Sequence, residues 1–535
     1  MAIHVTIVLS VGFLLVVGLV RLTLAAARSK SLPPGPPTLP MIGNLHQIPT
    51  KKAYLTFQKW SKEYGPIVSL KLGPGNLIVL NTARAVRDLF DKKGAIYSSR
   101  PPNHIGTELI ARDNTHLLLM PYGAEWRNQR KVYQSILNIT AVTSLQRLQE
   151  AEAVLTLQQL MQTPEKYYDH IRRYSTAVIL SSVFGIRGPE FEDPNIQRLY
   201  HVQDQFTAIL ETGATPPVDI FPFLKQIPTF MAPWRKWALS IRSEQRQLYF
   251  ELLKCVKDRL QRGVRRNCFM DELLDESKRA KHGLDEEHIA YIGGVLMEGG
   301  SDTTASTLLA FLLAMVKYPN VLRKAQAEVD QVCGTERSPT IQDVEKLEYI
   351  KNCVTEVLRW RPVAAGGIAH ALIEADDSYG QYLFPKGSVF LANTWAIHHD
   401  PDCYDRPEEF MPERYTKSEC GFKDGYDAPD AIRKIYGFGA GRRVCPGQHL
   451  AENSLRINMA KLVWAFSISP GKDVNGKSLS KDEIDDSIET QWTDGFLTAP
   501  KPFPITIRVR SPAHAEVIDR ERKTAANEVF RGYEG

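Results

Sequence analysis

The stretch that decides the fold is Phe438-Gly439-Ala440-Gly441-Arg442-Arg443-Val444-Cys445-Pro446-Gly447. A cysteine thiolate that coordinates an iron needs glycines that let the backbone turn tightly around the sulfur, and a cation close by. The stretch supplies three such glycines, an aromatic side chain ahead of them and an arginine two residues before the cysteine. We therefore predict that Cys445 binds an iron and that Arg443 pairs with a carboxylate of a bound macrocycle.

Simpler interpretations explain only parts of this stretch. A lone cysteine is usually a small buried hydrophobic residue. A dinucleotide-binding loop would need its third glycine where Val444 stands. A zinc site could use Cys445 and His449, but no Cys-x-x-Cys pair offers the remaining ligands. The stretch therefore favours a haem thiolate.

The composition favours one large domain in a reducing compartment. The 535 residues would by length suggest roughly three or four domains, yet no low-complexity linker interrupts the chain after the proline-rich stretch near residue 35. The seven cysteines are scattered and odd in number, which argues against a disulfide framework. The net charge of +5 is mild, and no lysine or arginine tract favours nucleic acid.

The N-terminal segment is a predicted membrane anchor. Residues 2–20 contain no Asp, Glu, Lys or Arg, and about 20 apolar residues in a helix span a bilayer core. A cleaved signal peptide is the alternative, since Ala25-Ala26-Ala27 resembles a cleavage site, but no Lys or Arg precedes the apolar run. Arg21, Arg28 and Lys30 follow it, so the bulk of the protein is expected on the cytoplasmic face.

The periodicity predicts a mostly α protein with a small β region (α+β). The predicted elements are a short helix at 55–64, a strand pair at 67–72 and 77–80 with a turn at 73–76, and weak strands at 388–391 and 505–509. Helical periodicity dominates from residue 82 to about 360. The β region is therefore expected to be assembled from both ends of the chain. The predicted division is an anchor at 1–30, a stiff proline-rich hinge at 31–40, a catalytic domain at 41–510 and a polar, mobile tail at 511–535.

The longest predicted helix runs from Asp285, which caps it, to about Lys317. Its centre holds Gly299-Gly300-Ser301-Asp302-Thr303, where each glycine costs about 1 kcal/mol relative to alanine. In one interpretation the glycines open the helix beside an iron, Thr303 hydrogen-bonds O₂ and Asp302 relays protons. In the other, the glycines serve close helix packing and the polar residues are ordinary. The segment alone does not decide between them, and the Cys445 loop favours the first.

The helical repeat also predicts which residues share a face. At about 100° per residue, a helix that turns Thr303 toward the haem also turns Gly299, Leu296 and Ile292 toward it. The carboxylate of Glu298 then points away. Glu298 is therefore expected either to support the residues that contact the substrate or to be a packing group.

Two further patterns concern charged groups. Glu356 and Arg359 lie on one helix face, a pair that is worth little if exposed. A second arginine, Arg414, follows in a Pro-Glu-Arg-Tyr segment. Trp126 and Arg130 place an indole N–H and a guanidinium on one helix face, and both donors suit haem propionates.

Taken in order, these motifs resemble those of the cytochrome P-450 superfamily, the haem-thiolate monooxygenases. The Cys445 loop matches the superfamily's Phe-Gly-x-Gly-x-Arg-x-Cys-x-Gly pattern at every fixed position. The centre of the long helix is similar to the superfamily's Ala/Gly-Gly-x-Asp/Glu-Thr-Thr/Ser segment. The helix with Glu356 and Arg359 resembles its Glu-x-x-Arg helix, and the segment with Arg414 resembles its Pro-Glu-Arg-Phe-like loop. The resemblance covers nearly the whole chain, and the pattern is similar to microsomal, reductase-dependent members, particularly fungal enzymes of secondary metabolism. It implies the cytochrome P-450 fold with an N-terminal transmembrane helix.

The resemblance also implies roles for individual residues. The expected contacts of haem b are Cys445 on the iron and Arg443, Trp126, Arg130, His370, Phe438, Gly439 and Gly447 around it. The expected catalytic residues are Asp302 and Thr303, and the expected structural cluster is Glu356, Arg359 and Arg414. The expected substrate pocket is lined by Leu296, Gly299, Ile292, Ala364, Ala365, Gly366, Gly367 and Phe496, together with Ile105, Leu118 and Phe206. The small run at 364–367 suggests room for a bulky, largely apolar molecule, and many relatives have proline where this chain has Ala369, beside His370.

The implied activity inserts one atom of O₂ into a largely apolar organic substrate, as a step in secondary-metabolite biosynthesis at the endoplasmic reticulum membrane. Because no nucleotide or flavin motif appears, electrons are expected from a separate NADPH-dependent flavoprotein reductase, and a b-type cytochrome is a further candidate partner. The basic residues expected to meet the reductase are Arg127, Lys131, Arg433 and Arg442.

Two other classes stay open at this point. One is a haem-thiolate isomerase or dehydratase that acts on a peroxide without O₂, against which the pair Asp302-Thr303 argues. The other is a non-enzymatic haem sensor or binding protein. The identity of the substrate does not follow from the sequence.

Overall fold

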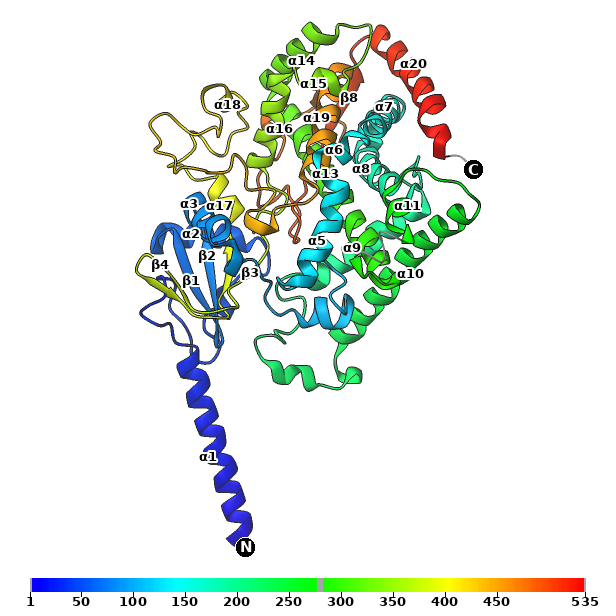
Figure 1. Cartoon of the computed structure of the whole chain (residues 1–535). Coiled ribbons are helices and arrows are strands. Elements are labelled where there is room, and N and C mark those ends of the chain that lie inside the picture. The colour runs from blue at the N-terminus through cyan, green and yellow to red at the C-terminus, as the bar shows by residue number, and fades with distance from the viewer. Residues whose placement is uncertain (1, 277–281, 534–535) are drawn as a thin grey trace.

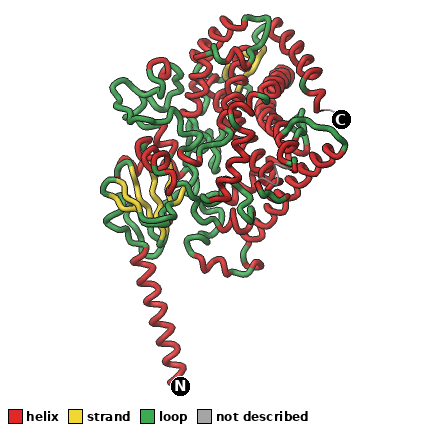
Figure 2. The backbone as a smooth tube through the Cα atoms, viewed as in Figure 1, coloured by secondary structure: helices red, strands yellow, loops and turns green. Residues whose placement is uncertain are grey.

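The computed structural model describes residues 2–276 and 282–533, except for some side chains of the first helix. A small β-rich part and a larger helical part lie side by side in Figure 1. The first helix, α1 (Ala2–Ala25), leaves the β-rich part as a separate rod. In Figure 2 most strands gather in the β-rich part, and helices make up most of the rest. The predicted class, mostly α with a small β region, is therefore confirmed.

The main sheet joins segments from the two halves of the chain. Its strands are, in spatial order, β1 (Ile67–Leu72), β2 (Gly75–Leu80), β6 (Val389–Ala392) and β3 (His370–Ala371). The predicted hairpin of β1 and β2 is confirmed, although β2 begins inside the predicted turn, and β2 runs parallel to β6. The sheet thereby carries His370 to the N-terminal half, where its ring stacks on Phe90 with 4.0 Å between ring centres.

The last predicted strand pairs elsewhere. β8 (Ile505–Val509) forms a separate two-stranded sheet with β7 (Phe466–Pro470), and β4 (Asp377–Tyr379) pairs with β5 (Tyr382–Phe384). The expectation of a single β region drawn from both ends is therefore wrong for residues 505–509, which find a partner strand close by in the sequence.

Helices form the larger part. Their bounds are α2 (Ala53–Tyr64), α3 (Ala83–Val86), α4 (Gly94–Tyr97), α5 (Ala124–Leu137), α6 (Ile139–Thr143), α7 (Gln146–Gln162), α8 (Tyr167–Phe184), α9 (Pro194–Leu210), α10 (Pro233–Gln261), α11 (Phe269–Leu273), α13 (Glu286–Lys317), α14 (Pro319–Cys333), α15 (Ile341–Val344), α16 (Glu348–Trp360), α17 (Thr394–His398), α18 (Arg414–Lys417), α19 (Gln448–Ala465) and α20 (Pro512–Glu528). The long helix α13 lies at the centre of this part (Figure 1).

Helix α13 begins and ends where the sequence predicts. The Asp285 carboxylate accepts a hydrogen bond from the His288 N–H and caps the first turn, and Pro319 follows the last turn. Most of α13 is buried, and it packs against α8. A Cβ at Gly300 would lie 2.8 Å from Ile179 of α8. This glycine therefore permits the close packing of the two helices.

The proline-rich stretch 31–40 has no helix and is bound to the sheet. The Arg28 guanidinium donates to the carbonyl oxygens of Gly35 at 2.6 Å and Ser69 at 3.0 Å. The Ser69 N–H in turn donates to the carbonyl oxygen of Pro34 at 3.0 Å. These bonds fix the stretch that follows α1 to strand β1.

The prediction of a mobile C-terminal tail is wrong. Residues 512–528 form α20, which packs against α7. Val517, Ile518 and Phe530 are buried, and the Arg187 guanidinium lies 3.4 Å from the centre of the Phe530 ring. A few apolar side chains on one helix face are enough to bury this segment, although its overall composition is polar.

Among the described residues, no single helix has the length and hydropathy expected of a membrane span, and α13 with α14 reaches that standard only as a pair bent by 108°. The predicted anchor falls on α1, several of whose side chains lie outside the described ones.

Candidate functional site

The Cys445 loop is a tight turn built on glycine. Gly439 and Gly441 have φ values of +78° and +62°, in the left-handed region that favours glycine. A Cβ at Gly441 would collide with the carbonyl oxygen of Phe90. The Cys445 N–H donates to the Phe438 carbonyl oxygen at 2.8 Å, which closes the loop around the sulfur. The loop therefore depends on the glycines that the sequence motif contains.

The sulfur of Cys445 lies in a low-dielectric environment with donors nearby. Burial raises the pKa of the Cys445 thiol, while the N–H of Gly447 and the Arg130 guanidinium act in the opposite direction. A Cβ at Gly447 would lie 3.9 Å from the sulfur. The surroundings thus offer hydrogen bonding and positive charge to a thiolate.

Three guanidiniums gather beside this loop. Arg443 donates to the carbonyl oxygens of Ser98 at 2.7 Å and Met120 at 2.6 Å. Arg130 donates to that of Val444 at 2.6 Å. Burial lowers the pKa of Arg443 to about 8, and Arg100 and Arg130 add to the shift. No described carboxylate forms an ion pair with any of the three.

Arg100 is the member of this group that sequence reasoning missed. It is buried, it donates to the carbonyl oxygens of Leu118 at 2.8 Å and Ala369 at 2.6 Å, and burial lowers its pKa to about 9. No helical spacing or motif marks it, because the loops and the sheet bring it to Arg443 only in the folded chain. Its bond to the Ala369 carbonyl oxygen holds the backbone directly before His370.

Two buried donors in this group of side chains lack a partner among the described residues. The indole N–H of Trp126 and the Nε–H of Arg130 are buried and make no hydrogen bond to described residues. The Arg443 guanidinium lies 4.4 Å from the centre of the Trp126 ring. His370 bonds the Tyr97 carbonyl oxygen through Nδ1 at 2.8 Å, and burial, with Arg100, keeps its pKa well below the ordinary value. The structure therefore brings together the predicted propionate contacts, Trp126, Arg130, His370 and Arg443.

Buried cations and unpartnered donors fit a ligand that carries carboxylates. Among the described residues, no three His, Cys, Asp or Glu side chains gather into a metal site. The donor set matches haem, whose two propionates are anionic and whose iron accepts a thiolate.

The centre of α13 presents different faces. The Thr303 hydroxyl donates to the Gly299 carbonyl oxygen at 2.7 Å and retains its acceptor capacity. A Cβ at Gly299 would meet no atom within 4 Å, so this side of the helix borders open space. Burial raises the pKa of Asp302, the Asp204 carboxylate adds to the rise and Arg172 opposes it. Gly299 thus fits the interpretation in which a glycine opens the helix beside an iron. Gly300 fits the interpretation in which a glycine permits close helix packing.

Glu298 and Ser301 have protein partners on the other faces. Glu298 is buried and accepts hydrogen bonds from His116, Gln245 and Tyr249. The Ser301 hydroxyl donates to Gln203 Oε1 at 2.9 Å.

Part of the predicted substrate lining belongs to the core. Ile292 is fully buried in an apolar cluster with α5, α8 and α10, and Leu296 lies in the same cluster. A Cβ at Gly367 would collide with the Ala392 carbonyl oxygen, and Ala365 is buried with Trp395. These small residues therefore allow close packing and do not create the predicted room. The remaining predicted residues Ala364, Gly366 and Phe496 are partly exposed.

The Glu356 cluster is a closed set of charges. The Glu356 carboxylate lies 2.9 Å from Arg359 Nε and 3.0 Å from Arg414 Nε, and all three side chains are buried. Arg359 also donates to the carbonyl oxygens of His398 and Pro407, both at 2.8 Å. Burial alone would lower the pKa of Arg359, but Glu356 outweighs it and raises that pKa.

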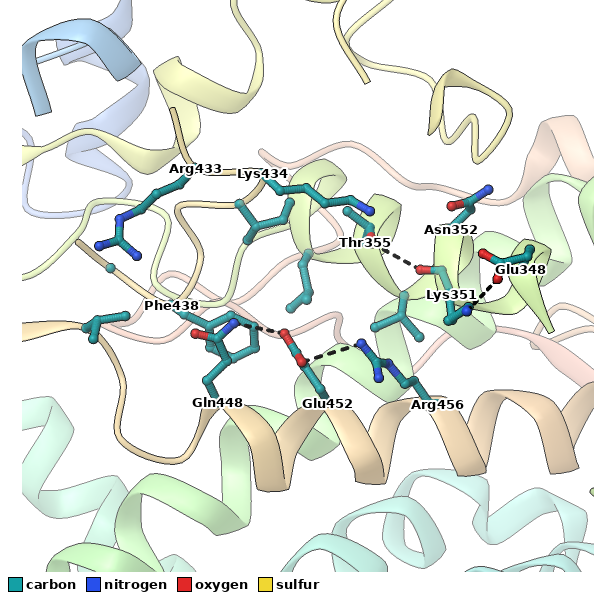
Figure 3. A pocket seen from close by; sticks show the side chains of 15 residues that line it. Glu348, Lys351, Asn352, Thr355, Arg433, Lys434, Phe438, Gln448, Glu452 and Arg456 are labelled. Carbon is teal, nitrogen blue, oxygen red and sulfur yellow. Dashed lines mark hydrogen bonds and ion pairs between the residues drawn. The ribbon is translucent and has the colours of Figure 1, made fainter. Parts of the chain in front are cut away.

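A pocket of about 530 Å³ lies beside the Cys445 loop (Figure 3). Phe438, Gly439 and Val444 form one end, and side chains of α16 and α19 form its sides. Within it, Lys351 pairs with Glu348 at 2.6 Å. Its lining holds the four basic side chains Lys351, Arg433, Lys434 and Arg456 against two acidic ones, Glu348 and Glu452. Nearby, Arg127 and Arg442 both contact the ring of Tyr122.

Comparison with known proteins gives matches along nearly the whole chain. Residues 33–503 match the family model described as Cytochrome P450. The chain is 40% identical to the cytochrome P450 monooxygenase atE of Aspergillus terreus, over 99% of this chain and 97% of that protein. It is 38% identical to the cytochrome P450 monooxygenase yanC of Aspergillus niger over 99% of each, and 40% identical to patH of Penicillium expansum, also a cytochrome P450 monooxygenase, over 94% of each.

Proposed function

The chain belongs to the cytochrome P450 family, and we propose that it is a membrane-anchored monooxygenase that inserts one atom of O₂ into a largely apolar organic substrate. The similar proteins are named monooxygenases, and the family implies a haem iron with a cysteine thiolate. The observation that carries the proposal is the Cys445 loop beside the buried guanidiniums of Arg100 and Arg130 and the half-buried one of Arg443, which no described carboxylate neutralises. The fungal sources of the similar proteins support a place in secondary metabolism.

The residues around the loop would hold the haem. Cys445 would bind the iron, while Arg100, Arg130, Arg443 and Trp126 would donate to the propionates. When bound, the haem supplies an iron that binds O₂, and the thiolate favours cleavage of the O–O bond.

Asp302 and Thr303 would deliver protons to the open side of α13. Because burial raises the pKa of Asp302, the carboxyl group can carry a proton nearer to neutral pH than an exposed aspartate can. The Thr303 hydroxyl donates to the Gly299 carbonyl oxygen and keeps its own oxygen free to accept a hydrogen bond. It can therefore accept from a proton donor and hold that donor in line with the cavity.

Electrons would enter at the face that carries the Cys445 loop. Three basic side chains of the 530 Å³ pocket pair with Glu348, Asp91 and Glu452, and Lys434 forms no ion pair with a described residue. Lys434 therefore suits an acidic partner surface, such as that of an NADPH-dependent flavoprotein reductase. Arg127 and Arg442 at Tyr122 extend the same positive surface. A b-type cytochrome could use the same face.

The membrane would hold the protein by α1, with the catalytic part on the cytoplasmic side of the endoplasmic reticulum. The charge-free run of residues 2–20 and the separate rod in Figure 1 support this arrangement. The segment between α9 and α10 lies toward the same end of the molecule in Figure 1 and carries Phe223, Phe230 and Met231, each more than half exposed. Apolar side chains of this size suit a lipid surface.

A reduced-CO spectrum tests the proposal. A thiolate ligand should give a band near ~450 nm, and Cys445→Ser should abolish it. Cys333→Ser, which removes another buried cysteine, is the matched control and should keep the band. The protein should also consume O₂ when supplied with NADPH and the reductase. An isomerase or a haem sensor would show the band without that consumption.

A further inference from the structure

Glu298 is a buried carboxylate that the proposed proton path does not use. It lies directly before Gly299 and is 8% exposed. Its oxygens accept hydrogen bonds from His116 Nε2 at 2.9 Å, from Gln245 Nε2 at 3.0 Å and from the Tyr249 hydroxyl. An ionised carboxylate, which has acceptors only, satisfies all three donors at once. The side chain therefore joins α13 to α10 and to the loop that carries His116.

The bond to Glu298 determines where the His116 ring lies. Since the carboxylate accepts from Nε2–H, the ring is fixed at that end, and its face stacks on Phe206 of α9 with 5.3 Å between ring centres. Nδ1 is buried and has no partner among the described residues. The His116 carbonyl oxygen accepts from the N–H groups of Leu119 and Met120 at 3.0 and 3.1 Å. A displaced ring would therefore move the turn at 116–120.

The same turn is held from its other side by the guanidiniums of the cofactor site. Arg100 donates to the Leu118 carbonyl oxygen at 2.8 Å, and Arg443 donates to that of Met120 at 2.6 Å. Residues 116–120 thus lie between one carboxylate on α13 and two guanidiniums beside the Cys445 loop. Gly299, the residue after Glu298 on α13, borders open space on another face of the helix.

We propose that Glu298 and His116 are positioning residues that set the shape of the substrate cavity and thereby select the substrates that fit it. The inference rests on the proposed function, because it takes the space beside Gly299 as the place where substrate meets the iron. A buried ion and its partners contribute little to net stability compared with apolar side chains of similar size, so such a network suits a role in defining one geometry. Glu298 takes no part in proton delivery in this scheme.

Two iron ligands of different size distinguish a change in the shape of the cavity from a change in how the haem is bound. Imidazole and 4-phenylimidazole are titrated against the full-length, haem-replete ferric protein, because the first reports the iron and the second also reports the space above it. The variants are Glu298→Gln, His116→Leu, His116→Gln, whose amide can still donate to Glu298, and Glu298→Gln with His116→Leu. Ser175→Ala is the control, since it removes a buried hydrogen bond of 2.8 Å to the adjacent Gly300 carbonyl oxygen without touching the loop.

Glu298→Gln and His116→Leu should each change the dissociation constant of 4-phenylimidazole by about tenfold, and that of imidazole by less than about twofold. His116→Gln and Ser175→Ala should stay close to the unaltered protein. The double variant should change the dissociation constant of 4-phenylimidazole by no more than either single variant does, since both residues act in one network. If Glu298→Gln loses its haem, the proposal is tested by comparing 4-phenylimidazole binding to His116→Gln and to His116→Leu.

Unchanged 4-phenylimidazole binding in His116→Leu would overturn the proposal, as would an equal loss for both probes, which would place the effect at the haem seat. Failure of the proposed function itself looks different, because the unaltered protein would then lack the band near ~450 nm.

Discussion

Two groups of buried or half-buried arginines in this protein balance their charge in opposite ways. Arg359 and Arg414 share the carboxylate of Glu356, and backbone carbonyls occupy much of what remains of their donor capacity. Arg100, Arg130 and Arg443 donate to carbonyls as well, yet no described carboxylate lies among them. The pKa of Arg359 is raised, whereas burial lowers the pKa values of Arg100 and Arg443 to about 9 and about 8.

The difference shows which of these positive charges are neutralised within the protein and which need an anionic ligand to neutralise them. Burying an unpaired charge is costly, so an excess of buried cations is stable only when an anion arrives. The Glu356 cluster is complete without a ligand and should act on stability. The group at Arg443 is incomplete without one and should act on cofactor retention. Substitutions in the two regions should therefore fail in different measurements.

The largest effect is expected from Glu356→Ala. Removal of the carboxylate leaves Arg359 and Arg414 as buried, unpaired charges, at a cost of about 3–5 kcal/mol, a large share of ordinary domain stability. The variant should unfold at lower denaturant concentration and should accumulate with little haem. Glu348→Ala on the same helix removes an exposed partner of Lys351 and should change stability by less than about 0.5 kcal/mol. A folded, haem-replete Glu356→Ala protein would show that the cluster is not essential.

Much of this contrast could be predicted from local spacing. Glu356 and Arg359 are three residues apart on a helix, and Trp126 and Arg130 are four apart, so each pair shares a face before any tertiary structure forms. The ends of α13 followed from its capping aspartate and its proline. Arg100 could not be found in this way, because its place depends on the loop at 116–120, on Ala369 and on Arg443, which meet only in the folded chain.

The errors have the same origin. The run at 364–367 was expected to give room because its residues are small, but Gly367 is small because a strand backbone lies against it. The C-terminal segment was expected to be mobile because it is polar, but one of its faces packs on α7. Small size and polarity are properties of a residue, whereas open space and exposure are properties of its neighbours.

A second, smaller effect is expected at Asp302 and Thr303 of α13. Asp302→Asn should slow the whole reaction by about 100-fold, because a general acid typically contributes on the order of 10²–10⁴-fold. Thr303→Ala should let NADPH consumption continue while O₂ leaves as peroxide and product falls. Parallel assays of NADPH, peroxide and product distinguish the two, and neither variant should lower the denaturation midpoint. Unchanged coupling in Thr303→Ala would make it a packing residue and favour the isomerase interpretation.

A third effect, of about tenfold, is expected when Arg100→Leu removes one propionate donor. The protein should fold, since the loss of one of three like charges relieves repulsion, but it should transfer haem to apomyoglobin faster. Arg147→Leu, which alters an exposed arginine paired with Glu528, is the control and should leave the transfer rate unchanged. An unaltered rate in Arg100→Leu would mean that this guanidinium does not contact the cofactor.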